Sequence, residues 1–124
     1  MAVQTFRDLE AWQRAMSMVE RCYGATKNFP REEQFGLTGQ LRRAAVSVPS
    51  NVAEGSSRLT TRAFINHLGI ARGSLSEVET CVEVALRLGY LTPSDAKALN
   101  EISASVGRLL NGLLRALRSR QPRV

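Results

Sequence analysis

The sequence has little of what catalytic and metal-binding proteins usually need. It contains one histidine, two cysteines and few aromatic residues. His67 has no partners at the spacing of zinc ligands, and no Glu-x-x-His motif of the diiron bundles occurs. No glycine-rich phosphate loop is present, and no serine has the neighbours of a catalytic triad. We therefore expect no enzyme, no bound metal and no cofactor.

Long apolar runs are missing as well. Charged residues interrupt the first 25 positions, so no secretory signal is recognisable, and no uncharged run is long enough to cross a bilayer. Cys22 and Cys81 lie far apart in apolar surroundings, which favours two buried thiols over a disulfide bridge. We expect a cytoplasmic protein without a membrane partner.

Acidic residues are scarce relative to basic ones. Seventeen lysine and arginine residues stand against 11 acidic residues, which gives a net charge of +6, and all but two of the basic residues are arginine. Arginine binds phosphate through its planar guanidinium group, so this excess is typical of a protein with a polyanionic partner. A genome whose base composition favours arginine codons would produce the same excess. Both interpretations stay open.

What the sequence does have is a helical spacing of apolar residues along its length. We predict four helices, over residues 8–26, 31–54, 61–88 and 93–118. Short connections favour an all-α, antiparallel up-down-up-down four-helix bundle, with residues 1–124 as one domain. Pro49 removes a backbone donor inside the second helix, so a kink or break is expected there. A three-helix domain is the alternative if Pro49 splits that helix.

Capping residues mark several of the predicted helix ends. Asp8 is the expected N-cap of the first helix, and the Thr60–Thr61 pair supplies cap candidates for the third. Thr92 followed by Pro93 gives the fourth helix the clearest start. Gly55 is expected to end the second helix.

Each predicted helix has an apolar stripe that should face the core. In the first helix the stripe is Leu9, Trp12, Met16, Val19 and Tyr23. In the fourth helix it is Leu99, Ile102, Val106, Leu109 and Leu113. A second stripe beside it consists of Leu110, Leu114 and Leu117. One bundle does not easily bury two faces of a helix, so these three leucines are candidates for a subunit interface; a wide core seam is the alternative.

Arginines gather in regions where helix stability alone does not explain them. Cations near a helix C-terminus stabilise it by about 0.3–1 kcal/mol each, which accounts for one or two of those late in the fourth helix. Arg58 and Arg62 flank the start of the third helix, where cations are mildly unfavourable. The candidate nucleic-acid-binding residues are Arg42, Arg43, Arg58, Arg62, Arg108, Arg115, Arg118 and Arg120.

Asn51 occupies a core position of the second helix where an apolar residue is expected. A buried asparagine needs hydrogen-bond partners, and Ser47, Ser50 and the carbonyl freed by Pro49 are close in sequence. We interpret these four residues as a structural knot that fixes helix register rather than as an active site. Glu54 should pair with an arginine or cap a helix.

The segment from Arg42 to Gly55, RRAAVSVPSNVAEG, resembles the signature of a bacterial family of four-helix-bundle proteins. This family is named for proteins encoded in intervening sequences of 23S rRNA genes and is also called the S23 ribosomal protein family. The similarity covers roughly residues 5–118. Supporting matches lie at Phe6, Leu9 and Trp12, Phe29–Pro30, Phe35–Leu37, Ala71–Glu77 and Leu88–Leu91.

The resemblance implies a cytosolic bundle that assembles into a ring-shaped homopentamer. A relative of the family, the accessory variability determinant of diversity-generating retroelements, binds nucleic acid and a reverse transcriptase through its basic pentamer. We therefore hypothesise a non-enzymatic homopentamer that binds RNA or DNA through backbone phosphates. The alternative is a protein-interaction scaffold whose partner is an unidentified protein and whose charge is incidental.

Overall fold

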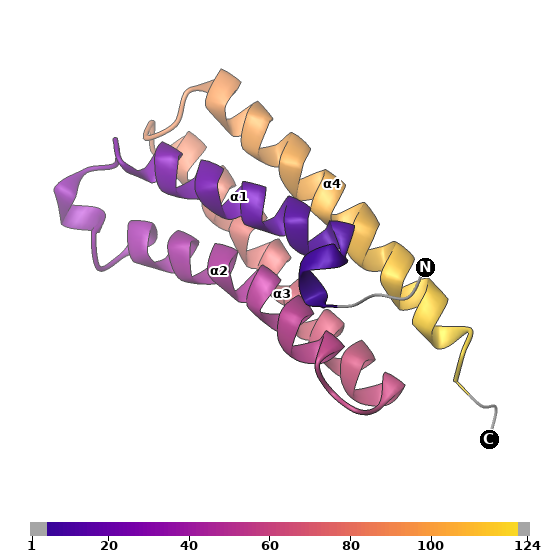
Figure 1. Ribbon diagram of the computed structural model, residues 1–124. Coiled ribbons are helices and arrows are strands. Elements are labelled where there is room, and N and C mark those ends of the chain that lie inside the picture. The colour runs from indigo at the N-terminus through magenta and orange to yellow at the C-terminus, as the bar shows by residue number, and fades with distance from the viewer. Residues whose placement is uncertain (1–4, 122–124) are drawn as a thin grey trace.

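Four long helices make up most of the computed structural model, which describes residues 5–121 (Figure 1). They are α1 (Glu10–Thr26), α2 (Leu37–Ser56), α3 (Thr61–Arg87) and α4 (Pro93–Arg118). Two short 3-10 helices, η1 (Phe6–Asp8) and η2 (Arg31–Glu33), precede α1 and α2. No strand occurs between residues 5 and 121, so the predicted all-α fold is confirmed.

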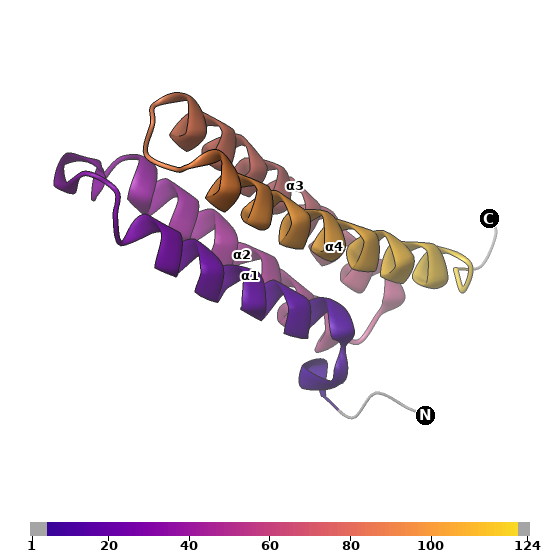
Figure 2. The ribbon, with the colours of Figure 1, turned by 90° about the horizontal axis from the view of Figure 1, so that it is seen from above.

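The helices form a closed bundle in which each packs against two neighbours, in the order α1, α2, α3, α4 and back to α1. Figure 2 shows them running along a common direction. Ser47 of α2 meets Ser74 of α3, and further along α2 Asn51 meets His67, so these two helices run antiparallel. The up-down-up-down arrangement of four helices is as predicted.

The face that α1 buries differs from the predicted one. Its buried residues are Ala11, Ala15, Met18, Cys22 and Thr26. Of the predicted stripe, Leu9, Trp12 and Val19 are partly buried and pack against the core, whereas Met16 and Tyr23 are exposed, so the prediction was wrong for these two. Small side chains let α1 approach its neighbours, while the larger ones cover the edge of the core.

The second apolar stripe of α4 forms the wide core seam that was the alternative to a subunit interface. Leu110, Leu114 and Leu117 are between 0% and 7% exposed, so they belong to the core and not to a subunit interface. The reason is that α4 packs against both α1 and α3, which together cover a broad apolar face. Leu109 and Leu113, expected at the centre of the seam, are the partly buried ones.

Neither Pro49 nor Gly55 ends a helix. α2 continues through the buried Pro49 as far as Ser56, so the three-helix alternative does not hold, and the kink stays a prediction. A Cβ on Gly55 would lie 2.8 Å from Cβ of His67 and 2.9 Å from Cδ1 of Phe64. The expectation of a helix stop was wrong, because Gly55 instead allows α2 and α3 to approach closely.

Two predicted helix starts are displaced toward the C-terminus. α1 begins at Glu10 with Leu9 as its N-cap residue, and Asp8 instead belongs to η1, where its carboxylate accepts from the Thr5 N–H at 3.1 Å. α2 begins at Leu37, whose N–H donates to Oε1 of Glu33 at 3.1 Å. Asp8 and Glu33 therefore each satisfy a backbone N–H near a helix start.

Glu33 also connects this corner to the far end of α3. The Tyr90 hydroxyl donates to Oε2 of Glu33 at 3.0 Å. This hydrogen bond raises the pKa of Tyr90 above its ordinary value of 10.0, because the carboxylate stabilises the protonated phenol. One carboxylate thus serves both the start of α2 and the connection between α3 and α4.

Candidate nucleic-acid interface

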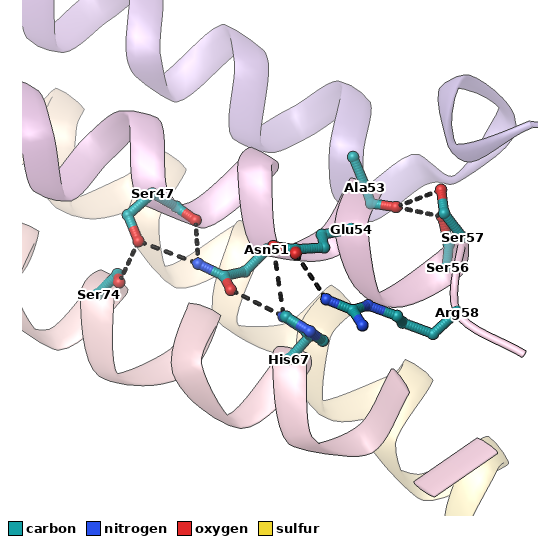
Figure 3. Close-up of polar contacts among 9 residues, drawn as sticks. All are labelled: Ser47, Asn51, Ala53, Glu54, Ser56, Ser57, Arg58, His67 and Ser74. Atoms are coloured by element: carbon teal, nitrogen blue, oxygen red, sulfur yellow. Dashed lines mark hydrogen bonds and ion pairs between the residues drawn. The ribbon is translucent and has the colours of Figure 1, made fainter. Parts of the chain in front are cut away.

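A chain of polar contacts links α2 to α3 within the segment that carries the signature (Figure 3). The Ser47 and Ser74 hydroxyls are 2.7 Å apart. Nδ2 of Asn51 donates to the Ser47 carbonyl at 2.9 Å and to the Ser47 hydroxyl at 3.1 Å. Oδ1 of Asn51 lies 3.1 Å from Nδ1 of His67. An amide oxygen can only accept, so Nδ1 of His67 holds the proton of this bond.

Glu54 extends the chain to the end of α2. Its Oε1 accepts from Nη2 of Arg58 at 2.8 Å, and its Oε2 lies 3.8 Å from Nδ1 of His67. Glu54 therefore has the arginine partner that the sequence left open, and Arg58 is engaged within the chain rather than free for phosphate.

The structure brings together only part of the proposed knot. Ser50 is exposed and makes none of these hydrogen bonds. Asn51 bonds to the carbonyl of Ser47 and not to that of Ala45, because a helical side chain leans back over the preceding turn. The polar chain joins two helices through direct side-chain hydrogen bonds, so its geometry is that of a structural contact.

Arg42 is also partly used inside the bundle. Its Nε donates to the Thr26 hydroxyl at 2.8 Å, and its guanidinium lies 4.5 Å from the centre of the Tyr23 ring. The side chain is half-buried and ties α2 to the end of α1. Arg43, one position further, is exposed and has no ion pair within residues 5–121.

Two arginines that were not among the candidates, Arg14 and Arg21, lie between α1 and α4 together with the candidate Arg108. A hollow of about 400 Å³ is lined by Arg14, Ser17, Arg21, Glu101, Ile102, Ser105 and Arg108. Nη1 of Arg14 donates to the Ser105 hydroxyl at 2.6 Å, which bridges the two helices. Arg14 and Arg21 lie on the same side of α1 because they are two turns apart. That spacing is visible in the sequence, but only the packing shows that α4 adds Arg108 to it.

The basic surface continues along α4. Arg108, Arg115 and Arg118 are exposed on its outer side. Over the described part of the chain, these three and Arg21 make no ion pair, and Arg14 lies 3.8 Å from Glu10. We call Arg14, Arg21, Arg108, Arg115 and Arg118 the α1–α4 basic face.

The remaining arginine candidates do not join this face. Arg58 lies in the turn between α2 and α3, Arg62 lies in the first turn of α3, and Arg42 and Arg43 lie in the first half of α2. Arg120 follows the end of α4 and is exposed. The eight candidates are therefore spread over separate parts of the bundle.

Other kinds of site find no support between residues 5 and 121. No group of three or more His, Cys, Asp or Glu side chains is placed to hold a metal ion in this range. Cys22 and Cys81 are both free and buried, and burial raises the pKa of Cys22 to about 11, with a smaller contribution from Cys81. None of the helices here combines the length and apolar character needed to cross a bilayer.

The fold has a relative among proteins of known structure. A protein of unknown function from the S23 ribosomal protein family of Bacteroides thetaiotaomicron superposes with a TM-score of 0.79 at 24% sequence identity. The superposition covers 85% of this chain and 95% of that one. No curated protein matches the chain. The sequence pattern of the 23S rRNA-intervening sequence proteins matches residues 7–112, which include the signature segment and most of all four helices. The chain therefore belongs to the family of 23S rRNA-intervening sequence proteins.

Proposed function

We propose that the protein is a cytoplasmic, non-enzymatic homo-oligomer, a pentamer, that binds RNA or DNA through backbone phosphates. The observation that carries the nucleic-acid part is the α1–α4 basic face. It presents five exposed arginines on two adjacent helices, and four of them have no acidic partner within residues 5–121. Unpaired surface cations of this kind release counterions from nucleic acid when they bind it.

The length of this face suits a nucleic-acid backbone. Arg108 and Arg118 are ten residues apart on α4, a distance of about 15 Å at the rise of an α-helix. Double-stranded DNA carries one charge per about 1.7 Å of its axis, so a face of this length meets several phosphates at once. Arginine also binds phosphate through two parallel hydrogen bonds, which lysine does not.

The face presents no aromatic ring on which a base could stack. Its five members are all arginines, and Phe6 and Trp12 pack edge-to-face against each other with ring centroids 5.2 Å apart. Sequence-tolerant binding to single strands usually relies on exposed rings on which bases stack. We therefore expect contacts to phosphates without strong sequence preference.

The test is fluorescence anisotropy of labelled RNA and DNA with the purified protein over a salt series. The logarithm of the binding constant should fall linearly with the logarithm of salt concentration. Arg115→Glu combined with Arg118→Glu should abolish binding. The matched control is Arg31→Glu combined with Arg72→Glu, which changes the net charge equally at exposed positions outside the face.

Two results would contradict the proposal. Equal loss of binding in the control would mean that net charge alone, and not this face, attracts nucleic acid. Absence of binding at low salt in the unaltered protein would remove the nucleic-acid function, and the search would turn to a protein partner for the scaffold alternative.

A further inference from the structure

The bundle leaves apolar surface uncovered on the outer sides of α2 and α3. Phe35, in the turn before α2, is 90% exposed. Next to it a hollow on the outer side of α2, which we call the α2 hollow, is lined by Tyr23, Gln34, Phe35, Thr38, Gly39, Arg42, Arg43, Val46 and Ser47. A second hollow on the outer side of α3, the α3 hollow, is lined by Ser76, Glu79, Thr80, Glu83, Val84 and Arg87.

We propose that these two surfaces are the two halves of one contact between copies of this chain. The α2 hollow of one copy, with Phe35 at its edge, packs against the α3 hollow of the next copy. The inference rests on the homo-oligomer proposed above and adds where its subunits meet. The occupant of each hollow is thus a second copy of the same protein.

Charge complementarity is the first argument for this occupant. The α2 hollow contains two arginines and no acidic residue, and Arg43 is without an ion pair within residues 5–121. The α3 hollow contains two glutamates, of which Glu83 is bound to Arg87 at 2.9 Å and Glu79 makes no ion pair in the same range. Pairing the α2 hollow with itself would place arginines against arginines, so a contact between unlike faces is favoured.

The register between α2 and α3 is the second argument. Gln40 contacts Glu77 and Ser47 contacts Ser74, which fixes the position of each helix along the long axis of the bundle. In a ring whose axis is parallel to the helices, a given residue has the same position along that axis in every copy. Arg43 lies between Gln40 and Ser47, so its position along the axis is within about one helical turn of that of Glu79 on the next copy.

The same register places apolar groups together. Phe35 lies beyond Gln40 toward the start of α2, and Val84 lies beyond Glu77 toward the end of α3. Because the helices are antiparallel, both displacements run in the same direction along the bundle. Rotation therefore brings the 90%-exposed ring of Phe35 to the height of Val84, which is 39% exposed.

The positions of the two faces explain why such an assembly closes. α2 and α3 occupy adjacent corners of the bundle, so their outer sides stand roughly 90° apart. The two contact faces of a subunit are about 90° apart in a ring of four copies and about 108° apart in a ring of five. The α1–α4 edge then points away from the ring axis, which leaves the α1–α4 basic face open on the outside.

Native mass spectrometry of the full chain without nucleic acid tests this contact. The unaltered protein should be a closed oligomer. Arg43→Glu and Glu79→Arg should each shift it to monomers, with at least about a tenfold rise in the subunit concentration needed for assembly. The double variant restores opposite charges at every contact and should recover the original mass. Phe35→Ser should also weaken assembly, and no second charge exchange compensates for this loss.

Matched controls separate the contact from general charge effects. Lys97→Glu and Glu20→Arg make the same charge changes at exposed positions on α4 and α1 and should keep the original mass. Circular dichroism verifies that each variant is folded.

Three outcomes would overturn the inference. If the single variants keep the original mass, the subunits meet elsewhere, while the homo-oligomer and its nucleic-acid binding stand. If the singles dissociate and the double variant does not recover, Arg43 and Glu79 do not face each other. If the unaltered protein is a monomer, both the contact and the proposed homo-oligomer are refuted, and the anisotropy measurement alone decides nucleic-acid binding.

Discussion

Replacing Gly55 with alanine should destabilise the protein, although alanine is the better helix former. Gly55 lies within α2. There the substitution gains about 1 kcal/mol of helix propensity. Against this gain, the new Cβ would lie 2.8 Å from Cβ of His67 and 3.3 Å from the backbone oxygen of Phe64. Neither atom is the far end of a flexible side chain, so α2 and α3 must move apart.

The balance of these terms gives the size of the effect. Overpacking of a close contact costs about 1–3 kcal/mol, and a collision that involves backbone belongs to the upper part of that range. We expect a net loss of about 1–2 kcal/mol in the free energy of unfolding. For a chain of this length that corresponds to a fall of about 3–8 °C in Tm.

Gly73 supplies the control. It lies within α3, and no atom approaches within 4 Å of a Cβ built there. Gly73→Ala should therefore raise stability by about 0.5–1 kcal/mol through helix propensity alone. Urea unfolding followed by circular dichroism at one protein concentration measures both variants. If Gly55→Ala proves as stabilising as Gly73→Ala, the close approach of α2 and α3 at Gly55 does not exist.

Three further changes test individual contacts. Asn51→Ala should lower the free energy of unfolding by about 1–2 kcal/mol, because it leaves partly buried hydrogen-bonding groups unpaired; an unchanged urea midpoint would refute this. Glu33→Ala should lower the free energy of unfolding by about 1 kcal/mol. It should also return the pKa of Tyr90 toward its ordinary value, which an ultraviolet titration detects. Because the pKa of Cys22 is raised from 9.0 to about 11, the folded protein holds this proton more tightly than the unfolded chain. The resulting stability, about 3 kcal/mol, is present below pH 9 and is lost as pH rises toward 11. At pH 8 the Cys22 thiol should therefore react with a disulfide reagent only as fast as the protein opens, and rapid labelling of the folded protein would contradict its burial.

Local signals account for the helices that were predicted best. α4 has the predicted limits because Thr92 caps it, accepting from the Asp95 N–H at 3.1 Å, and Pro93 fits its first turn. Thr60 likewise caps α3 through the Ala63 N–H. These interactions span three residues, so the sequence contains them fully.

The misplaced features depend on distant parts of the chain. The core face of α1 was assigned to its largest side chains, whereas packing buries Ala15 and Met18, and Met18 meets Ser103 of α4. Leu110 was left between a subunit interface and a wide core seam, because its coverage by neighbouring helices cannot be read from its own helix. The α1 part of the α1–α4 basic face was missed for the same reason, since Arg14 and Ser105 are 91 positions apart.

The polar chain and Gly55 also affect the number of copies in the ring that we propose. The angle between the α2 and α3 hollows is set by how these two helices pack, and the Asn51–His67 bond and the absence of a Cβ at Gly55 determine that packing. A small change of this angle alters the number of copies that close a ring, because four and five copies differ by only about 18°. Gly55→Ala should therefore broaden the distribution of oligomer masses while Arg43 and Glu79 remain in place. A single unchanged mass, despite lower stability, would show that the α2–α3 packing and the subunit contact are independent.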